Sequence, residues 1–340
     1  MLQQKGERRT GKKNLNKVSG ILAIMLLCLA YFTVAVEAAG LELILYTNKP
    51  SYWIGDEVKV YGYLFYNSTL VGNGTVNLEV DSPFADYPIL LRTMSTGTLP
   101  QTQQTIDILS LFSCTQSGTP KSSFTRGTMA YFNVTLRNNN YTTTFFTVTL
   151  SFLDSAKGIV DSINWSDSVI AFGRASYIVP MLIPDAARTG TTTVYANVFS
   201  KMPKIGGYAI AREKNSTFTV TSTLSMSETT YSPPVEVLAN GQFYTNFTIP
   251  RYQYVGNYSI YVTTRNYNQT ATNQKKIEVR VPDVNKDGRV NVLDLIKVGS
   301  KLGWTGPPGA IVEDVNRDGK VNILDLIVVS NFLGWVSPPT

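Results

Sequence analysis

The chain has 340 residues, of which 43% are hydrophobic and 16% charged, and it contains no histidine. This composition supports packed cores and excludes extended disorder, His-dependent catalysis and His-ligated metal sites. Residues 1–38 hold six of the 30 basic and two of the 24 acidic residues, so the formal charge of +6 falls to +2 for the remainder. This near-neutral balance predicts no nucleic-acid partner.

The N-terminal segment 1–38 has the layout of an export signal. Residues 1–17 are polar and basic, residues 18–36 are uncharged and mostly apolar, and small side chains at Val36 and Ala38 precede a cleavage point. The apolar run is also just long enough to span a bilayer. The segment is therefore either a cleaved signal peptide or an uncleaved membrane anchor with its basic end inside. Both interpretations predict an extracellular chain, secreted or held at the cell surface by residues 18–36.

N-glycosylation sequons of the form Asn-x-Ser/Thr support an extracellular location. They are expected in surface loops, and all lie between the leader and the C-terminal repeat described below. The predicted acceptors are Asn67, Asn73, Asn133, Asn140, Asn164, Asn215, Asn246, Asn257 and Asn268.

Residues 41–281 are predicted to form β-strands. Apolar and polar residues alternate in Val58–Tyr66, Ala130–Leu136 and Tyr258–Val262, and Gly, Pro and Asn separate such runs. This spacing is typical of antiparallel sandwiches. Cys114 is the one cysteine outside the leader, so no internal disulfide is expected there.

The number of strands indicates a discontinuous first domain. Residues 41–95 supply about four strands and residues 236–281 about three, and together they match one immunoglobulin-like sandwich. We therefore expect these two segments to form one sandwich, with residues 100–222 inserted between them as a second sandwich. The alternative is three consecutive sandwiches, of which the last is incomplete.

Parts of this region resemble extracellular modules. Asn48–Val58, with its Lys49-Pro50-Ser51-Tyr52 opening, resembles the start of a macroglobulin-type immunoglobulin-like domain, and Asn240–Pro250 with Gly256–Val262 resembles its closing half. Residues 100–222 look like adhesion-type immunoglobulin-like modules of prokaryotic, in particular archaeal, surface proteins. The fold class implied is mainly β, with two immunoglobulin-like sandwiches and a small helical module at the C-terminus.

No catalytic motif is found in the strand region, so the chain is predicted not to be an enzyme. Its carboxylates Asp154, Asp161, Asp167 and Asp185 share no spacing and are expected in solvated loops. Several aromatic side chains are expected on exposed strand faces. There they are predicted either to pack against neighbouring strands or to stack on a surface glycan. They are Trp53, Tyr61, Tyr63, Trp165, Tyr258 and Tyr261.

The C-terminal residues 283–335 contain a duplicated motif. Asp283–Asp294 recurs as Asp314–Asp325 with an offset of 31 residues, and the same offset relates Leu302-Gly303-Trp304 to Leu333-Gly334-Trp335. Each copy follows the pattern of an EF-hand loop, which presents six to eight oxygen ligands to Ca²⁺.

Two Ca²⁺ ions are therefore predicted, one in each loop. Glycines at loop position 6, Gly288 and Gly319, allow the sharp turn. Asp at position 12, in place of the usual Glu, is one methylene shorter and requires the helix to move inward for bidentate closure. The predicted ligands are Asp283, Asn285, Asp287, the carbonyl of Arg289, Asn291 and Asp294, and correspondingly Asp314, Asn316, Asp318, the carbonyl of Lys320, Asn322 and Asp325.

Each loop is followed, but not preceded, by a predicted helix. These helices are expected over Leu293–Leu302 and Leu324–Leu333, each ending at a glycine. A duplicated loop with only its exit helix resembles a type I dockerin. The resemblance implies a module that folds on Ca²⁺ and binds a cohesin domain of another protein.

In dockerins, loop positions 10 and 11 help to select the cohesin. Here they are Val292-Leu293 and Ile323-Leu324, which either contact the partner or pack the two halves together. The predicted function is thus an exported, non-catalytic protein that attaches through a dockerin and uses its sandwiches as spacer or adhesin. The alternative is a polysaccharide-degrading or carbohydrate-binding subunit of a cohesin–dockerin assembly.

Overall fold

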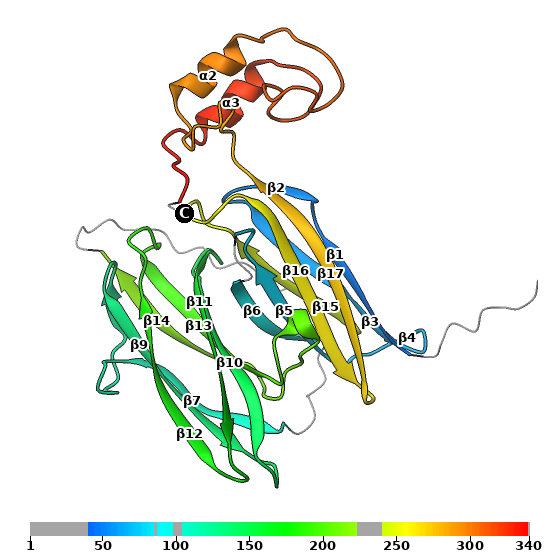
Figure 1. Ribbon diagram of the computed structural model, residues 1–340, viewed down its shortest axis with the longest axis vertical. Coiled ribbons are helices and arrows are strands. Elements are labelled where there is room, and N and C mark those ends of the chain that lie inside the picture. The colour runs from blue at the N-terminus through cyan, green and yellow to red at the C-terminus, as the bar shows by residue number, and fades with distance from the viewer. Residues whose placement is uncertain (1–39, 85–86, 98–103, 223–239, 339–340) are drawn as a thin grey trace, which may run out of the picture. The chain divides into compact units, whose positions relative to one another are not determined.

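The computed structural model describes residues 40–84, 87–97, 104–222 and 240–338. All the elements below belong to the unit that begins at Leu41 (Figure 1). None of the described helices is long and apolar enough to cross a membrane. The predicted signal or anchor, residues 18–36, lies outside the described residues.

The described chain is mainly β, which confirms the predicted fold class. The strands before the central segment are β1 (Leu41–Thr47), β2 (Ser51–Trp53), β3 (Glu57–Tyr66), β4 (Thr69–Leu70), β5 (Thr75–Asp81) and β6 (Pro88–Ser95). The central elements are β7 (Ile106–Cys114), β8 (Ser123–Thr125), β9 (Met129–Asn138), β10 (Thr144–Asp154), β11 (Ile159–Val169), β12 (Arg174–Leu182), β13 (Gly190–Phe199), the short 3₁₀ helix η1 (Pro203–Ile205) and β14 (Lys214–Thr221). The last elements are β15 (Gln242–Thr248), β16 (Gly256–Asn266), β17 (Gln269–Arg280), α2 (Val292–Gly299) and α3 (Ile323–Ser330).

Strands from both sides of the central segment share two sheets. One sheet has the order β1-β3-β15, with β4 also paired to β3, and the other has the order β2-β17-β16-β5-β6. Phe247 lies opposite Val58, and Ile260 lies opposite Val80. Figure 1 shows β15–β17 beside the strands formed by the first part of the chain. These two sheets are called the first sandwich here.

Alternation along β3 buries one face of the strand. Val58, Val60 and Leu64 are fully buried, whereas the intervening side chains are partly exposed. Gly62 lies on the buried face, where an added Cβ would come within 1.8 Å of the Ile44 carbonyl oxygen. Only glycine therefore allows this close approach of β1 to β3.

One predicted sugar-stacking residue is placed differently from expectation. Tyr258 is fully buried, and its hydroxyl donates to the carbonyl of Tyr254 at 2.5 Å. Burial of the apolar ring stabilises the core, and the hydrogen bond to Tyr254 removes the cost of an unpaired buried hydroxyl. Three carboxylates expected in loops lie on strands instead: Asp154 ends β10, and Asp161 and Asp167 lie on β11. The alternation places Tyr258 on the same face as the buried Ile260 and Val262, so its burial could have been predicted. The positions of the carboxylates could not, because β10 and β11 carry polar residues on both faces.

The central segment forms its own pair of sheets, called the second sandwich here. Their orders are β11-β10-β13-β14-β8 and β12-β9-β7. Phe132 packs on Phe152 and Phe218 with ring centroids 4.8 and 5.1 Å apart, at the centre of a separate core. Cys114 is a buried free cysteine, as expected for a small apolar side chain.

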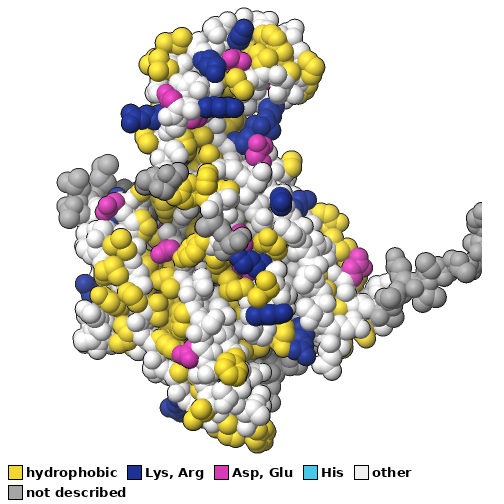
Figure 2. Space-filling view, viewed as in Figure 1, with side chains coloured by type: hydrophobic (Ala, Val, Ile, Leu, Met, Phe, Trp, Pro, Cys, Tyr) yellow, Lys and Arg dark blue, Asp and Glu magenta, His cyan; other side chains and the backbone are white. Residues whose placement is uncertain are grey.

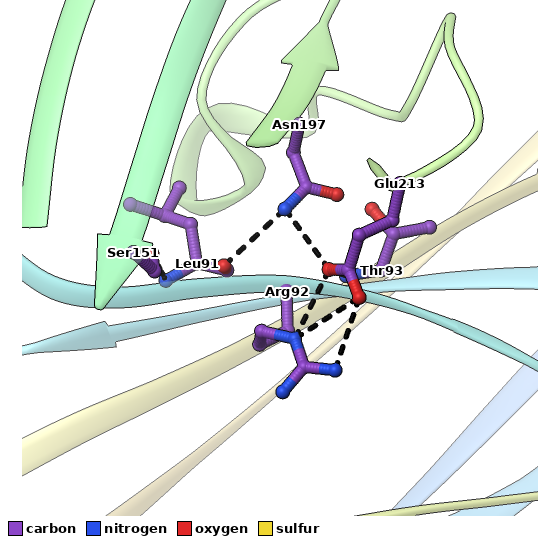
Figure 3. Close-up of polar contacts among 6 residues, drawn as sticks. All are labelled: Leu91, Arg92, Thr93, Ser151, Asn197 and Glu213. Atoms are coloured by element: carbon purple, nitrogen blue, oxygen red, sulfur yellow. Dashed lines mark hydrogen bonds and ion pairs between the residues drawn. The ribbon is translucent and has the colours of Figure 1, made fainter. Parts of the chain in front are cut away.

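A partly buried polar network joins the two sandwiches (Figure 3). The guanidinium of Arg92 on β6 donates from Nε and Nη2 to the Glu213 carboxylate at 3.0 Å each. Asn197 on β13 donates to the same carboxylate at 3.0 Å, and the backbone N–H of Leu91 donates to Ser151 Oγ at 2.8 Å. The edge strand β6 of the first sandwich therefore bonds to β10, to β13 and to the segment just before β14 in the second sandwich.

A second junction surrounds Glu79 on β5, which is fully buried. Its Oε2 accepts from the backbone N–H of Lys204 in η1 at 2.7 Å, and the Lys204 ammonium lies 3.1 Å from Asp81. Burial, the strongest influence, raises the pKa of Glu79 from 4.5 to about 8.

The raised pKa predicts a falling stability as the pH increases. Between pH 4.5 and about 8 the folded protein retains a proton on Glu79 that the unfolded chain has released. The stability present below pH 4.5 is therefore lost progressively as the pH rises through about 8. The Glu79→Gln variant should lose less stability as the pH rises, because its side chain stays neutral. The difference in melting temperature between the variant and the wild type should therefore be largest at alkaline pH. Thermal unfolding at pH 5, 7 and 9 tests this, with the exposed Glu42→Gln as control. Parallel pH profiles for the wild type and Glu79→Gln would contradict the prediction.

Candidate functional site: the duplicated C-terminal module

The C-terminal module (residues 283–335) places its two helices directly after the two loops. Asn291 and Asn322 cap α2 and α3 by accepting from the N–H groups of Leu293 and Leu324 at 2.7 Å. Each helix begins one residue earlier and ends three residues earlier than predicted. The last turns tighten, since Lys301 donates to the carbonyl of Val298 three residues back.

The side chains at positions 1, 3 and 5 organise each loop around its own backbone. In the first loop, the Asp283 carboxylate accepts from the N–H groups of Asp287 (3.2 Å) and Gly288 (2.9 Å). Asn285 Oδ1 accepts from Asp287 N–H at 2.9 Å. Asp314, Asn316 and Asp318 repeat this arrangement in the second loop. The structure therefore brings the oxygen-bearing side chains of each loop onto one tight turn.

Glycine at position 6 is required by this turn. Gly288 and Gly319 have φ values of +81° and +86°, which an L-residue adopts only with strain. A Cβ on Gly319 would also meet the Gly306 carbonyl oxygen at 2.7 Å.

The position-12 carboxylates Asp294 and Asp325 are fully buried. Asp294 Oδ1 accepts from the N–H groups of Val284 (2.7 Å) and Asn285 (3.0 Å), and its Oδ2 accepts from Asn291 N–H (2.9 Å). Asp325 makes equivalent contacts in the second loop. The shorter side chain thus ties the start of the loop to the start of the helix, and its role as a calcium ligand stays a prediction.

The donor set suits a hard cation. No three Asp, Glu, Cys or His side chains in the described residues are grouped as metal ligands; each loop instead combines two carboxylates and an Asn amide at positions 1, 3 and 5. The Asn285 amide donates to Asp287 and lowers the pKa of that exposed carboxyl, which keeps it charged. Oxygen donors of this kind fit Ca²⁺. A bound ion would supply the positive charge that holds the loop oxygens together.

The position-9 amides have a structural role beside the predicted ligand role, which stays a prediction. The side-chain oxygens of Asn291 and Asn322 are helix caps, and Asn291 Nδ2 donates weakly to Asp287 at 3.4 Å. Direct coordination by these amides would compete with capping. The position-7 residues Arg289 and Lys320 pair with Val336 and Thr305 in short antiparallel bridges, whose hydrogen bonds are made by the neighbouring residues.

The two repeats close each other reciprocally. Val321 in the second loop exchanges backbone hydrogen bonds with Gly303 and Trp304, and Val290 in the first loop does so with Gly334 and Trp335, all at 2.9 Å. Both pairs obey the 31-residue offset, as do the bonds Gly306 N–H to Gly319 O and Ser337 N–H to Gly288 O. The module therefore has an internal two-fold repeat in which each loop is completed by the far end of the other copy.

The helices leave a matched row of apolar side chains in solvent. The predicted partner-binding residues Val292 and Leu293 are 61% and 53% exposed, and Ile323 and Leu324 are 62% and 51% exposed. Half or more of each side chain therefore takes no part in packing the halves together, and its contact with a partner stays a prediction. Ile296 and Ile327 extend this row, and their i, i+3 spacing from Leu293 and Leu324 was the signal in the sequence that could have identified them. The apolar stripe consists of Val292, Leu293, Ile296, Ile323, Leu324 and Ile327, and Figure 2 shows apolar side chains on this module.

Other residues fasten the module to the first sandwich. The Trp335 indole N–H donates to the Arg251 carbonyl at 2.9 Å, and the Arg251 guanidinium donates to the Asn331 carbonyl at 3.0 Å. The rings of Trp53 and Phe332 lie 5.7 Å apart. Nothing in the sequence pattern pointed to Arg251, because this contact joins residues about 80 positions apart.

The sequon asparagines are all at least partly accessible. Asn133 and Asn246 are half-buried and the other seven are exposed. The expectation of loops is wrong for five of them, which lie on strands because the solvent-facing side of a strand is also polar. These five are Asn133, Asn164, Asn215, Asn246 and Asn257.

No family model matches the chain, and no curated protein matches it. Similar solved structures include the C-terminal domain of Wzt, with 10% identity, a TM-score of 0.31 and coverage of 36% of this chain and 77% of that one. The CARDB domain of a Pyrococcus furiosus protein in complex with di-metal ions has 12% identity, a TM-score of 0.24 and coverage of 36% and 88%. A Bacteroides uniformis β-glucuronidase has 7% identity, a TM-score of 0.28 and coverage of 51% and 27%, so this chain spans under a third of its length. Since every TM-score is below 0.5, these similarities identify no family and no activity.

Proposed function

We propose that this chain is an exported, non-catalytic protein that attaches to another protein through its calcium-loaded C-terminal module. The partner class, a cohesin domain, follows from the resemblance to type I dockerins, and the two sandwiches act as spacer or adhesin. The leader pattern and the accessible sequons support a secreted or cell-surface location. One observation supports the attachment role most directly: two loops with the same donor residues each lead into a helix with the same exposed apolar stripe.

The stripe is energetically costly unless it is covered. Burying one Val, Leu or Ile side chain stabilises a complex by about 1.5–3 kcal/mol before the cost of association. Groups of exposed apolar side chains mark interaction sites on soluble proteins. The contacts of Trp335, Phe332 and Asn331 with the first sandwich leave all six stripe residues about half or more exposed.

The test is binding of the full chain to a panel of immobilised cohesin domains, in calcium and in EGTA. Calcium-dependent binding to at least one cohesin is the expected result. Binding that is equal in EGTA, or no binding to any cohesin in millimolar calcium, would overturn the proposal. Binding to plant or microbial glycans that persists in EGTA would support the carbohydrate-binding alternative instead.

Charged substitutions in the stripe separate partner binding from folding. The double variant Ile296→Asp/Ile327→Asp should weaken cohesin binding by about tenfold or more, because a buried unpaired carboxylate is costly at an interface. Both side chains are exposed, so stability should change by only about 0.5 kcal/mol. Biolayer interferometry and thermal unfolding measure the two effects. Leu182→Asp, an equally exposed apolar residue of the second sandwich, is the control and should leave binding unchanged.

A further inference from the structure

A cavity of about 470 Å³ lies at the junction of the two sandwiches, and no residue of the C-terminal module lines it. One wall comes from Ser82, Phe84 and Tyr87, which lie between β5 and β6, another from β11, and a third from the segment before β16. The lining residues used below are Phe84, Tyr87, Asp161, Ser162, Gln253 and Tyr254.

The cavity is walled by aromatic rings. Phe84 and Tyr254 lie 4.8 Å apart with their planes tilted by 47°. The hydroxyl of Tyr87 donates to the carbonyl of Ser162, which holds this ring against β11. Phe84 is 64% exposed and Tyr87 is 45% exposed, so their rings are available to a ligand. Aromatic faces carry negative potential and attract cations.

A carboxylate without a cationic partner completes the wall. Asp161 accepts a hydrogen bond from the backbone N–H of Ser162 at 2.7 Å, and no Lys or Arg of the described residues forms an ion pair with it. Burial raises the pKa of Asp161 to about 6, so the group is charged at neutral pH at an energetic cost. A ligand that brings positive charge would offset that cost more fully than the neutral hydroxyls of a sugar, which can only donate hydrogen bonds to the carboxylate.

From these features we infer that the cavity binds an alkylammonium group, held by the faces of Phe84, Tyr87 and Tyr254 and by the Asp161 carboxylate. The group belongs either to a small quaternary amine or to a lysine side chain of a peptide. This site is independent of calcium and of the apolar stripe, so it adds a second binding function to the chain.

Isothermal titration calorimetry with the full chain tests the inference. The probes are choline, its neutral isostere 3,3-dimethyl-1-butanol, and Nα-acetyl-lysine amide. Either ammonium probe should bind at least about tenfold more tightly than the neutral isostere, and the stronger of the two identifies the source of the group. Equal binding of choline and its isostere, or no ammonium binding at tens of millimolar, would overturn the inference.

Two variants identify the residues. Asp161→Asn and Phe84→Leu should each weaken ammonium binding by about tenfold. Phe84 is exposed, so its replacement tests the site even if Asp161→Asn alters folding. Asp167→Asn removes an exposed carboxylate from the same strand and is the matched control. Undiminished binding in Phe84→Leu and Asp161→Asn would contradict the assignment.

Discussion

Replacing Asp283 and Asp314 together by alanine is expected to abolish calcium binding by the C-terminal module. Each carboxylate accepts two backbone hydrogen bonds within its loop and is the predicted ligand at position 1. Its loss removes both the negative charge that attracts Ca²⁺ and the acceptor that shapes the turn. Affinity at each site should fall by about a hundredfold or more, since calcium affinity depends on the ligand charge count and on loop rigidity.

Calcium titration by calorimetry measures this effect, and tryptophan fluorescence reports its structural consequence. Trp335 binds the Arg251 carbonyl through its indole N–H, so disorder of the module should shift the emission of this residue to the red. The single variant Asp283→Ala is the internal control and should bind one ion fewer than the wild type. Unchanged stoichiometry in the double variant would show that the loops are not the calcium sites.

Replacing Arg92 by alanine is expected to destabilise the protein by about 3–5 kcal/mol, because a largely buried carboxylate would lose its cation. The side chains of Arg92 and Glu213 are only 16% and 13% exposed. The Arg92 guanidinium also stacks on the Tyr195 ring at 3.5 Å, and this contact would be lost as well. Urea unfolding followed by far-ultraviolet circular dichroism measures the loss.

A second ion pair provides the matched control. Arg137 and Asp107 are closer, at 2.6 Å, but are 43% and 38% exposed. Arg137→Ala should therefore cost only about 0–1 kcal/mol. The double variant Arg92→Met/Glu213→Leu should recover much of the stability lost in Arg92→Ala, because no unpaired charge remains. Equal losses in Arg92→Ala and Arg137→Ala would contradict the importance of burial at this junction.

Local patterns were sufficient where neighbouring residues decide the structure. Alternation predicted β3 and β9 because successive side chains of a strand point to opposite faces. The 31-residue repeat predicted both loops and the helix that follows each loop. It also predicted the sharp turns at Gly288 and Gly319, whose φ values are positive. The helix ends were missed by three residues, because the closing bonds to Gly303 and Gly334 come from the other repeat.

Charge pairing could not be read along the chain, and burial could be read only in part. Tyr258 shares a strand face with Ile260 and Val262, so the alternation indicates its burial, whereas Tyr261 lies on the opposite, partly exposed face. The junction of Arg92 with Glu213 joins residues 121 positions apart, and no local signal distinguishes it from a surface pair. The exposure of Ile296 and Ile327 likewise depends on which helix faces the rest of the module covers.

The strand-rich class of the fold and the oxygen donors at the C-terminus could be predicted, because side-chain alternation and loop ligand spacing are properties of adjacent residues. The folded chain was needed to show that the two repeats complete each other, that the apolar stripe stays in solvent and that Asp161 lines a cavity with aromatic rings but without a described cation. These outcomes depend on contacts between distant segments, whose energies are set by packing and desolvation in three dimensions.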